Sequence, residues 1–136
     1  MKRLGIIGLA LLGAINVAHA GNPTLLRAVN YVMSNDEENT VMSVVNEDEC
    51  VFKDSRTGWE IYLNNIDPRN TSYERIVMGN RWITKMTVHG AGKPTSSWGM
   101  MESQIGFATG LDLDRHARAW QYIYGPGGCK AAQAAF

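Results

Sequence analysis

Residues 112–130, DLDRHARAWQYIYGPGGCK, decide how the fold closes. Apolar side chains recur there at helical spacing, at Leu113, Ala117, Trp120 and Tyr124. This periodicity predicts a helix from about Asp112 to Tyr124, with Trp120 as the anchor that fixes it on a sheet. The glycines and proline of residues 125–128 end the helix abruptly. Cys129 follows at once, so the segment after the helix is placed to be tied to another part of the chain.

The sequence before this helix predicts a second helix and a run of strands. The helix is expected over Pro23–Met33 with Asn22 as its cap, because proline is tolerated in a first turn. Strands are expected over Thr40–Asn46, Cys50–Lys53, Trp59–Leu63, Ser72–Met78 and Trp82–His89, with a weak one over Gln104–Ala108. Residues 64–70 are interpreted as turns, since Asn, Asp and Pro favour bends. This order predicts an α+β domain, a small antiparallel sheet packed by an N-terminal and a C-terminal helix.

The first twenty residues have the three parts of a signal peptide. Lys2 and Arg3 precede an apolar stretch over residues 4–17, and Ala18-His19-Ala20 offers the small residues that a signal peptidase reads. We therefore expect cleavage after Ala20, a single domain over residues 21–136, and a periplasmic or secreted location. The apolar stretch is shorter than the roughly 20 residues of a membrane-spanning helix, which makes a retained anchor the alternative.

Cys50 and Cys129 are the two cysteines of the chain. An even pair in a protein sent to an oxidising compartment predicts an intramolecular disulfide. Two free thiols and an intermolecular bridge are the alternatives. A catalytic redox pair is not favoured, because such cysteines are generally close in sequence.

The charge balance argues against polyanionic partners. Cleavage would remove Lys2 and Arg3 from 13 basic and 13 acidic residues, leaving 11 against 13 and a net charge of about −2. No sequence-wide attraction to nucleic acid or to anionic membranes is expected from that value. We expect no nucleic-acid partner and no membrane anchor after cleavage.

Few residues are typical of catalysis or ligand binding. His89 and His116 are the histidines left after cleavage, and neither belongs to a His-x-x-x-His or Cys-x-x-Cys arrangement, so no metal or cofactor is expected. Asp112 shares a helix face with His116, a weak metal pattern against which charge stabilisation of the helix start competes. Tyr122 lies off the apolar stripe and is a candidate for surface contact. Tyr122, His89 and His116 are thus the weak ligand-binding candidates.

Several blocks of the sequence are familiar in combination. They are residues 50–52 (CVF), 62–65 (YLNN), 88–90 (VHG), 118–124 (RAWQYIY) and 128–130 (GCK), with a terminal Phe136. Together they resemble a group of small secreted proteins of alphaproteobacteria that carry no assigned function. The resemblance implies export, paired cysteines and a single domain, and it carries over no active-site residues.

Two classes of function remain. The first is an exported, non-catalytic module that binds an envelope protein or a small ligand. The second is a small extracytoplasmic enzyme, hydrolase-like, whose residues meet only in the fold. The first is favoured because no Gly-x-Ser-x-Gly or comparable catalytic motif is present.

Overall fold

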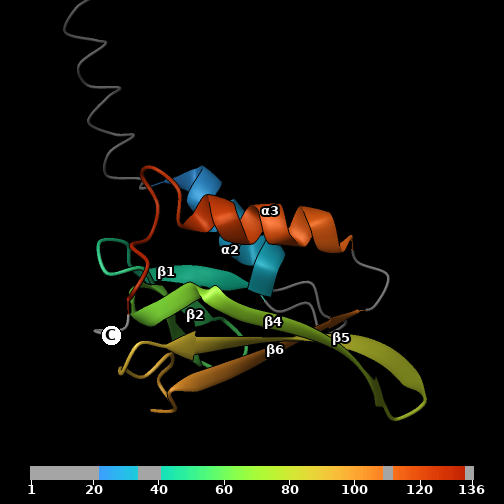
Figure 1. Ribbon diagram of the computed structural model, residues 1–136. Helices are drawn as coiled ribbons and strands as arrows, with labels where there is room; N and C mark the ends of the chain where they lie inside the picture. The colour runs from blue at the N-terminus through green and yellow to red at the C-terminus, as the bar shows by residue number, and fades with distance from the viewer. Residues whose placement is uncertain (1–21, 34–40, 109–111, 134–136) are drawn as a thin grey trace, which may run out of the picture.

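The computed structural model describes residues 22–33, 41–108 and 112–133. Along this described part of the chain, one helix precedes six strands and one helix follows them (Figure 1). The helices are α2 (Pro23–Met33) and α3 (Leu113–Ile123). The strands are β1 (Met42–Asn46), β2 (Val51–Asp54), β3 (Glu60–Tyr62), β4 (Ile66–Met78), β5 (Arg81–Gly90) and β6 (Glu102–Ala108). The predicted α+β class is therefore confirmed, whereas the predicted signal peptide lies outside the described residues.

The strands form two antiparallel sheets rather than the single sheet expected. One sheet has the order β1-β2-β3 and the other β4-β5-β6. A short 3-10 helix over Leu63–Asn65 separates β3 from β4, so the chain changes sheet there. An isolated bridge between Ile61 of β3 and Ser96 joins the loop between β5 and β6 to the first sheet. In Figure 1 the two helices lie together on the same side of the strands.

Both helices begin where the sequence predicted. Asn22 caps α2, since its Oδ1 accepts from the backbone N–H of Leu25 at 3.0 Å. Asp112 caps α3 by accepting from Asp114 and Arg115 at 3.0 and 3.3 Å. Each cap satisfies N–H groups that the first helical turn leaves unpaired. Within the described ranges, neither helix is long and apolar enough to cross a membrane.

The core lies between the helices and the inner faces of the strands. Its fully buried members include Val29, Val32, Phe52, Ile61, Leu63, Ile66, Met86, Val88 and Ile123. Trp120 belongs to it, as expected, with 4% of its surface exposed. The apolar stripe predicted for α3 is wrong at its first residue, because Leu113 is exposed while His116 is completely buried. His116 takes the inward position one turn before Trp120, and Leu113 is the first residue of the helix.

Residues 66–70 do not form the expected turn. They belong to β4, whose pairing with β5 shifts register between Asp67 and Thr71. Turn-type contacts are nevertheless present, since Asp67 accepts from the backbone N–H of Arg69 at 3.1 Å and Thr71 donates to the carbonyl of Pro68 at 2.7 Å. The bends are accommodated as an irregularity inside a 13-residue strand.

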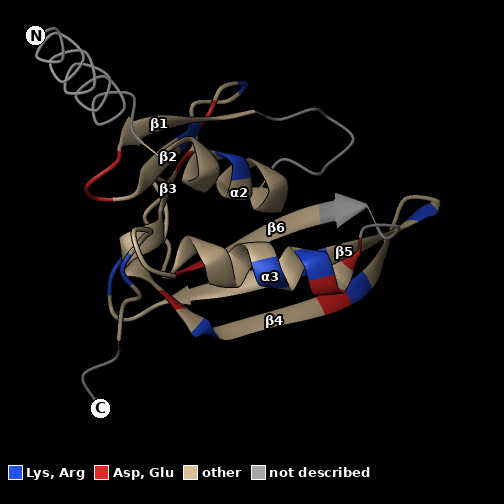
Figure 2. Cartoon of the chain, turned by 90° about the horizontal axis from the view of Figure 1, so that it is seen from above, with Lys and Arg blue, Asp and Glu red and all other residues tan. Residues whose placement is uncertain are grey.

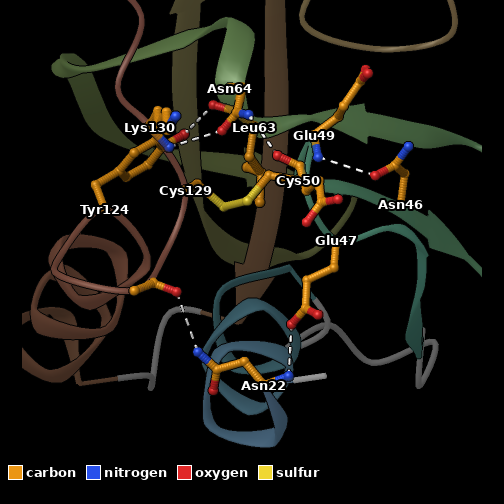
Figure 3. The surroundings of a disulfide bond; sticks show 12 residues. Asn22, Asn46, Glu47, Glu49, Cys50, Leu63, Asn64, Tyr124, Cys129 and Lys130 are labelled. Atoms are coloured by element: carbon orange, nitrogen blue, oxygen red, sulfur yellow. Dashed lines mark hydrogen bonds between the residues drawn. A yellow bond between two sulfur atoms is a disulfide. The ribbon is translucent and has the colours of Figure 1, made fainter. Parts of the chain in front are cut away.

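The predicted disulfide between Cys50 and Cys129 is present, with the two Cα atoms 5.7 Å apart (Figure 3). It ties the segment after α3 to the turn before β2. Hydrogen bonds on both sides hold this segment, because Cys129 donates to the carbonyl of Ile123 at 2.7 Å and Lys130 donates to Oδ1 of Asn64 at 2.8 Å. The end of α3 is thereby fixed against the first sheet.

Candidate functional site

The three side chains that the sequence singled out lie in different surroundings. Tyr122 is on α3 and is 45% exposed. His89 is near the end of β5, where its Nδ1 lies 3.5 Å from Oε1 of Glu102, its cross-strand neighbour on β6. His116 is buried completely. The structure does not bring the three into one site, and a ligand-binding role for each stays a prediction.

His116 is held at both ring nitrogens. Its Nε2 lies 3.2 Å from the carbonyl oxygen of Val32, which can only accept, so we assign the proton to Nε2. Its Nδ1 then accepts from the hydroxyl of Tyr73 at 3.2 Å. Burial lowers the pKa of His116, and the hydrogen bond to Val32 acts in the opposite direction. His116 therefore joins α2, α3 and β4 as a neutral side chain.

A groove follows β6, the edge strand of the second sheet. It comprises two cavities of about 230 and 320 Å³ that share Trp59, Trp98 and Gln104. We call it the β6 groove. One wall is β6 over residues 102–106, and the opposite wall is formed by Trp59, Trp98 and the turn over residues 54–57.

The groove meets β6 at its backbone edge. Successive residues of a strand point to opposite faces, so a cavity lying on one face would touch every second residue. The β6 groove instead touches every residue from 102 to 106. Within the described part of the chain, β5 alone pairs with β6. Every second residue of an antiparallel edge strand directs its N–H and C=O away from its neighbour, here into the groove.

Two tryptophans form the opposite wall. The rings of Trp59 and Trp98 pack edge to face, with centroids 6.1 Å apart. Trp98 is 74% exposed, more than any other large apolar residue described. Trp59 is half-buried, and its Nε1 is buried without a hydrogen-bond partner among the described residues. A buried donor without a partner costs about 1–3 kcal/mol, which a ligand acceptor placed there would recover.

The loop before β6 places Trp98 beside Trp59. The backbone of residues 95–97 pairs with β3, where Tyr62 donates to the carbonyl of Thr95 and Ser97 donates to that of Glu60, each at 2.9 Å. The chain then turns at Gly99, whose φ of +80° is one that glycine adopts without strain. Trp98 is thus carried by a loop with fixed ends.

The cavity beside β2 has polar groups in its lining as well as apolar ones. The carboxylate of Asp54 is buried and accepts from the backbone N–H of Arg56 at 2.8 Å, while the Arg56 guanidinium lies 4.0 Å away. Asp54 therefore shapes the turn that carries Arg56 and Thr57 into the groove wall. Among the described residues, no three His, Cys, Asp or Glu side chains are grouped as metal ligands would be.

Sequence reasoning missed this groove. The sequence predicts Trp59 only as the first residue of a strand, and it predicts a weak strand over Gln104–Ala108. The available signal was the apolar run Trp98-Gly99-Met100-Met101, which is unusual for an exposed loop. No protein-family model matches the chain, and no curated protein or solved structure is similar to it at a significant level.

Proposed function

We propose that the protein is an exported, non-catalytic binding module of the cell envelope, and that its β6 groove receives an extended polypeptide segment. The signal-peptide pattern of residues 1–20 and the disulfide support export, because structural disulfides form and persist in oxidising compartments. The partner is then an envelope protein with an accessible extended segment.

The position of the groove at a strand edge carries the proposal. An extended segment that lies beside β6 can pair with the backbone groups that β6 directs away from β5. Such strand addition derives affinity from main-chain hydrogen bonds and specificity from pockets for alternate side chains. Residues 102–106 span about 13 Å at the usual strand rise, enough for a segment of roughly five residues.

The side chains of the groove fit the same ligand. Met33, Met42 and Ile105 line the cavity beside β2 together with Trp59, which suits one apolar side chain of the segment. The unpaired Nε1 of Trp59 would donate to a carbonyl of that segment. An exposed tryptophan such as Trp98 supplies a large, rigid contact surface at little entropic cost.

A peptide-binding experiment tests this proposal. The disulfide-bonded protein is titrated by fluorescence anisotropy with a pool of labelled heptapeptides that carry an apolar residue at every second position. We expect Trp98→Ala to weaken the tightest binder at least ten-fold, whereas Trp82→Ala, at another exposed tryptophan outside the groove, leaves it unchanged.

The backbone contribution is tested on the peptide itself. N-methylation at alternate residues of the peptide removes N–H groups and keeps every side chain. It can be placed in two registers, on one set of alternating residues or on the other. Binding should be abolished in the register that removes the N–H groups pairing with β6. Binding that is insensitive to N-methylation in both registers would contradict strand addition. A pool without any binder would contradict the peptide ligand altogether.

A further inference from the structure

A carboxylate occupies a core position in the first sheet. Asp54 is the last residue of β2 and lies opposite Met42 of β1, so its side chain shares the inward face with those of Met42 and Phe52. Asp54 is 6% exposed, although aspartate is almost never fully buried unless it is paired. The position thus departs from the apolar pattern of its strand face, and such departures are typical of functional or strained sites.

One carboxylate oxygen of Asp54 is held and the other is open. Oδ1 accepts from the backbone N–H of Arg56 at 2.8 Å. Oδ2 has no hydrogen bond to any described residue, because the guanidinium of Arg56 lies 4.0 Å from it, beyond hydrogen-bond distance. That guanidinium belongs to a side chain that is 47% exposed, so solvent weakens the contact. A donor that reached Oδ2 directly would meet a carboxylate whose side chain is only 9% exposed.

The cavity beside this carboxylate is otherwise lined largely by apolar side chains. Its volume is about 230 Å³, and Met33, Met42, Trp59 and Ile105 line it together with Asp54. A lysine side chain has the same two parts, because its methylene stem packs on apolar surface while its ammonium needs a polar or charged partner. Arginine fits less well, since its planar fork pairs best with both oxygens of a carboxylate and Oδ1 is already engaged.

We propose that the extended segment in the β6 groove carries a lysine, whose stem fills the cavity beside β2 and whose ammonium contacts Oδ2 of Asp54. This assignment rests on the proposed function and adds the side chain that the groove selects. Residues 104–106 of β6 line the same cavity, so a segment paired with β6 passes its mouth. Trp59 is an independent sign of a ligand there, because its buried Nε1 has no partner among the described residues.

Arg56 also lines the cavity and would favour the opposite ligand, a carboxylate. The two charges differ in burial, since the side chain of Asp54 is 9% exposed and that of Arg56 is 47% exposed. A charge acts most strongly where solvent is excluded, so the carboxylate determines which ligand charge is accepted. Figure 2 shows basic and acidic residues scattered over both helices and both sheets, so the selection is local rather than the effect of one large charged patch.

Peptides that differ at one position test the assignment. The tightest heptapeptide is resynthesised with lysine, norleucine or glutamate at each of its apolar positions in turn, and its binding to the disulfide-bonded protein is measured by fluorescence anisotropy. Norleucine keeps the stem of lysine and removes the ammonium. At one position we expect lysine to bind about ten-fold more tightly than norleucine, the scale of a hydrogen bond to a charged group, and glutamate to bind more weakly than norleucine.

Asp54→Asn tests the carboxylate itself. It keeps the shape of the side chain and an acceptor for the backbone N–H of Arg56, and it should make the lysine and norleucine peptides bind equally. Asp48→Asn is the matched control, because it removes the same charge outside the groove, and it should keep the preference for lysine. Thermal unfolding shows whether each variant is folded. If Asp54→Asn is not, the three peptides on the unmodified protein decide the question.

Lysine that binds no better than norleucine at every position would overturn the assignment and leave strand addition in place. So would a preference for lysine that survives in folded Asp54→Asn. Tightest binding of the glutamate peptide would assign the cavity to Arg56 instead. A pool without any binder would overturn this inference together with the proposed function.

Discussion

Trp120 and Tyr124 together connect α3 to β4 and to the 3-10 helix between the sheets. The Trp120 ring packs edge to face on Tyr124 with centroids 5.1 Å apart, and its Nε1 donates to Oγ1 of Thr71 on β4 at 3.2 Å. Tyr124 continues the connection, since its hydroxyl donates to the carbonyl of Leu63 at 2.8 Å. The contacts of these two residues hold α3 on the strands.

Replacing Trp120 with Ala should destabilise the protein by about 3–5 kcal/mol, because a large buried aromatic leaves both lost contacts and a cavity. Denaturant unfolding measures this change. Trp98→Ala is the matched control and should alter stability by less than about 0.5 kcal/mol, since Trp98 is 74% exposed. Similar stabilities for the two variants would contradict the core role of Trp120.

His116 should make stability depend on pH. Its folded-state pKa is lowered by burial, while the unfolded chain keeps the ordinary value of 6.5. The unfolded state therefore binds more protons below pH 6.5, and stability is lost as the pH falls from 6.5 through the lower folded-state pKa. The facing hydroxyl of Tyr73, whose pKa is raised by burial, does not titrate in this range.

The measurement is the free energy of unfolding between pH 7.5 and 5, for the protein and for His116→Gln. The difference in free energy of unfolding between the two proteins should change with pH, although the His116→Gln protein is less stable at every pH. His89 and the carboxylates remain in both proteins, so their contributions cancel. A difference that stays constant from pH 7.5 to 5 would show that His116 does not titrate differently on folding.

At the scale of elements, the disulfide closes the chain after α3. Its cysteines are 79 residues apart, and the chain-entropy argument assigns a loop of that length about 4 kcal/mol as an upper value. We expect Cys50→Ala with Cys129→Ala to lower the free energy of unfolding by up to that amount. Each single variant should lose about as much as the double. If the double variant unfolds at the same denaturant concentration as the oxidised protein, the cross-link is not a source of stability.

Elements with local signals could be predicted, and those that depend on distant parts of the chain could not. The bounds of α2 match the expectation, because the Asn22 cap and the helical spacing are encoded within a few residues. The bend at Asp67 also has a local signal, but whether it becomes a turn or an irregular strand depends on pairing with His89. Strand alternation predicts Trp82 and Met86 on one face of the sheet. It could not show that Met86 is buried while Trp82 is exposed.

The β6 groove depends on the same kind of long-range contact. Its walls come from residues 54–59, 96–100 and 102–106, which approach one another only when β3 meets the loop before β6 at Ile61 and Ser96. Periodicity along the chain carries no information about that meeting. The disulfide was predictable because it needed only the number of cysteines and the expected compartment.

At the scale of the whole molecule, the account requires export. We expect the mature chain to begin at Gly21, because Ala18 and Ala20 place small residues at the positions read by the peptidase. Intact-mass measurement of the protein from the periplasmic or secreted fraction checks this start, together with the loss of two hydrogens for the disulfide. A dominant species that keeps residues 1–20, with two thiols open to alkylation, would contradict export.

Residue-resolved hydrogen exchange tests the central claim, strand addition at β6, most directly. In the free protein, amides of residues 102–106 that pair with β5 should exchange slowly, and the alternate amides that face the groove should exchange fast. Saturation with the tightest heptapeptide should slow the fast set and the indole N–H of Trp59 together. Bound peptide with no added protection of those amides would show that the ligand does not pair with β6, and would contradict the account.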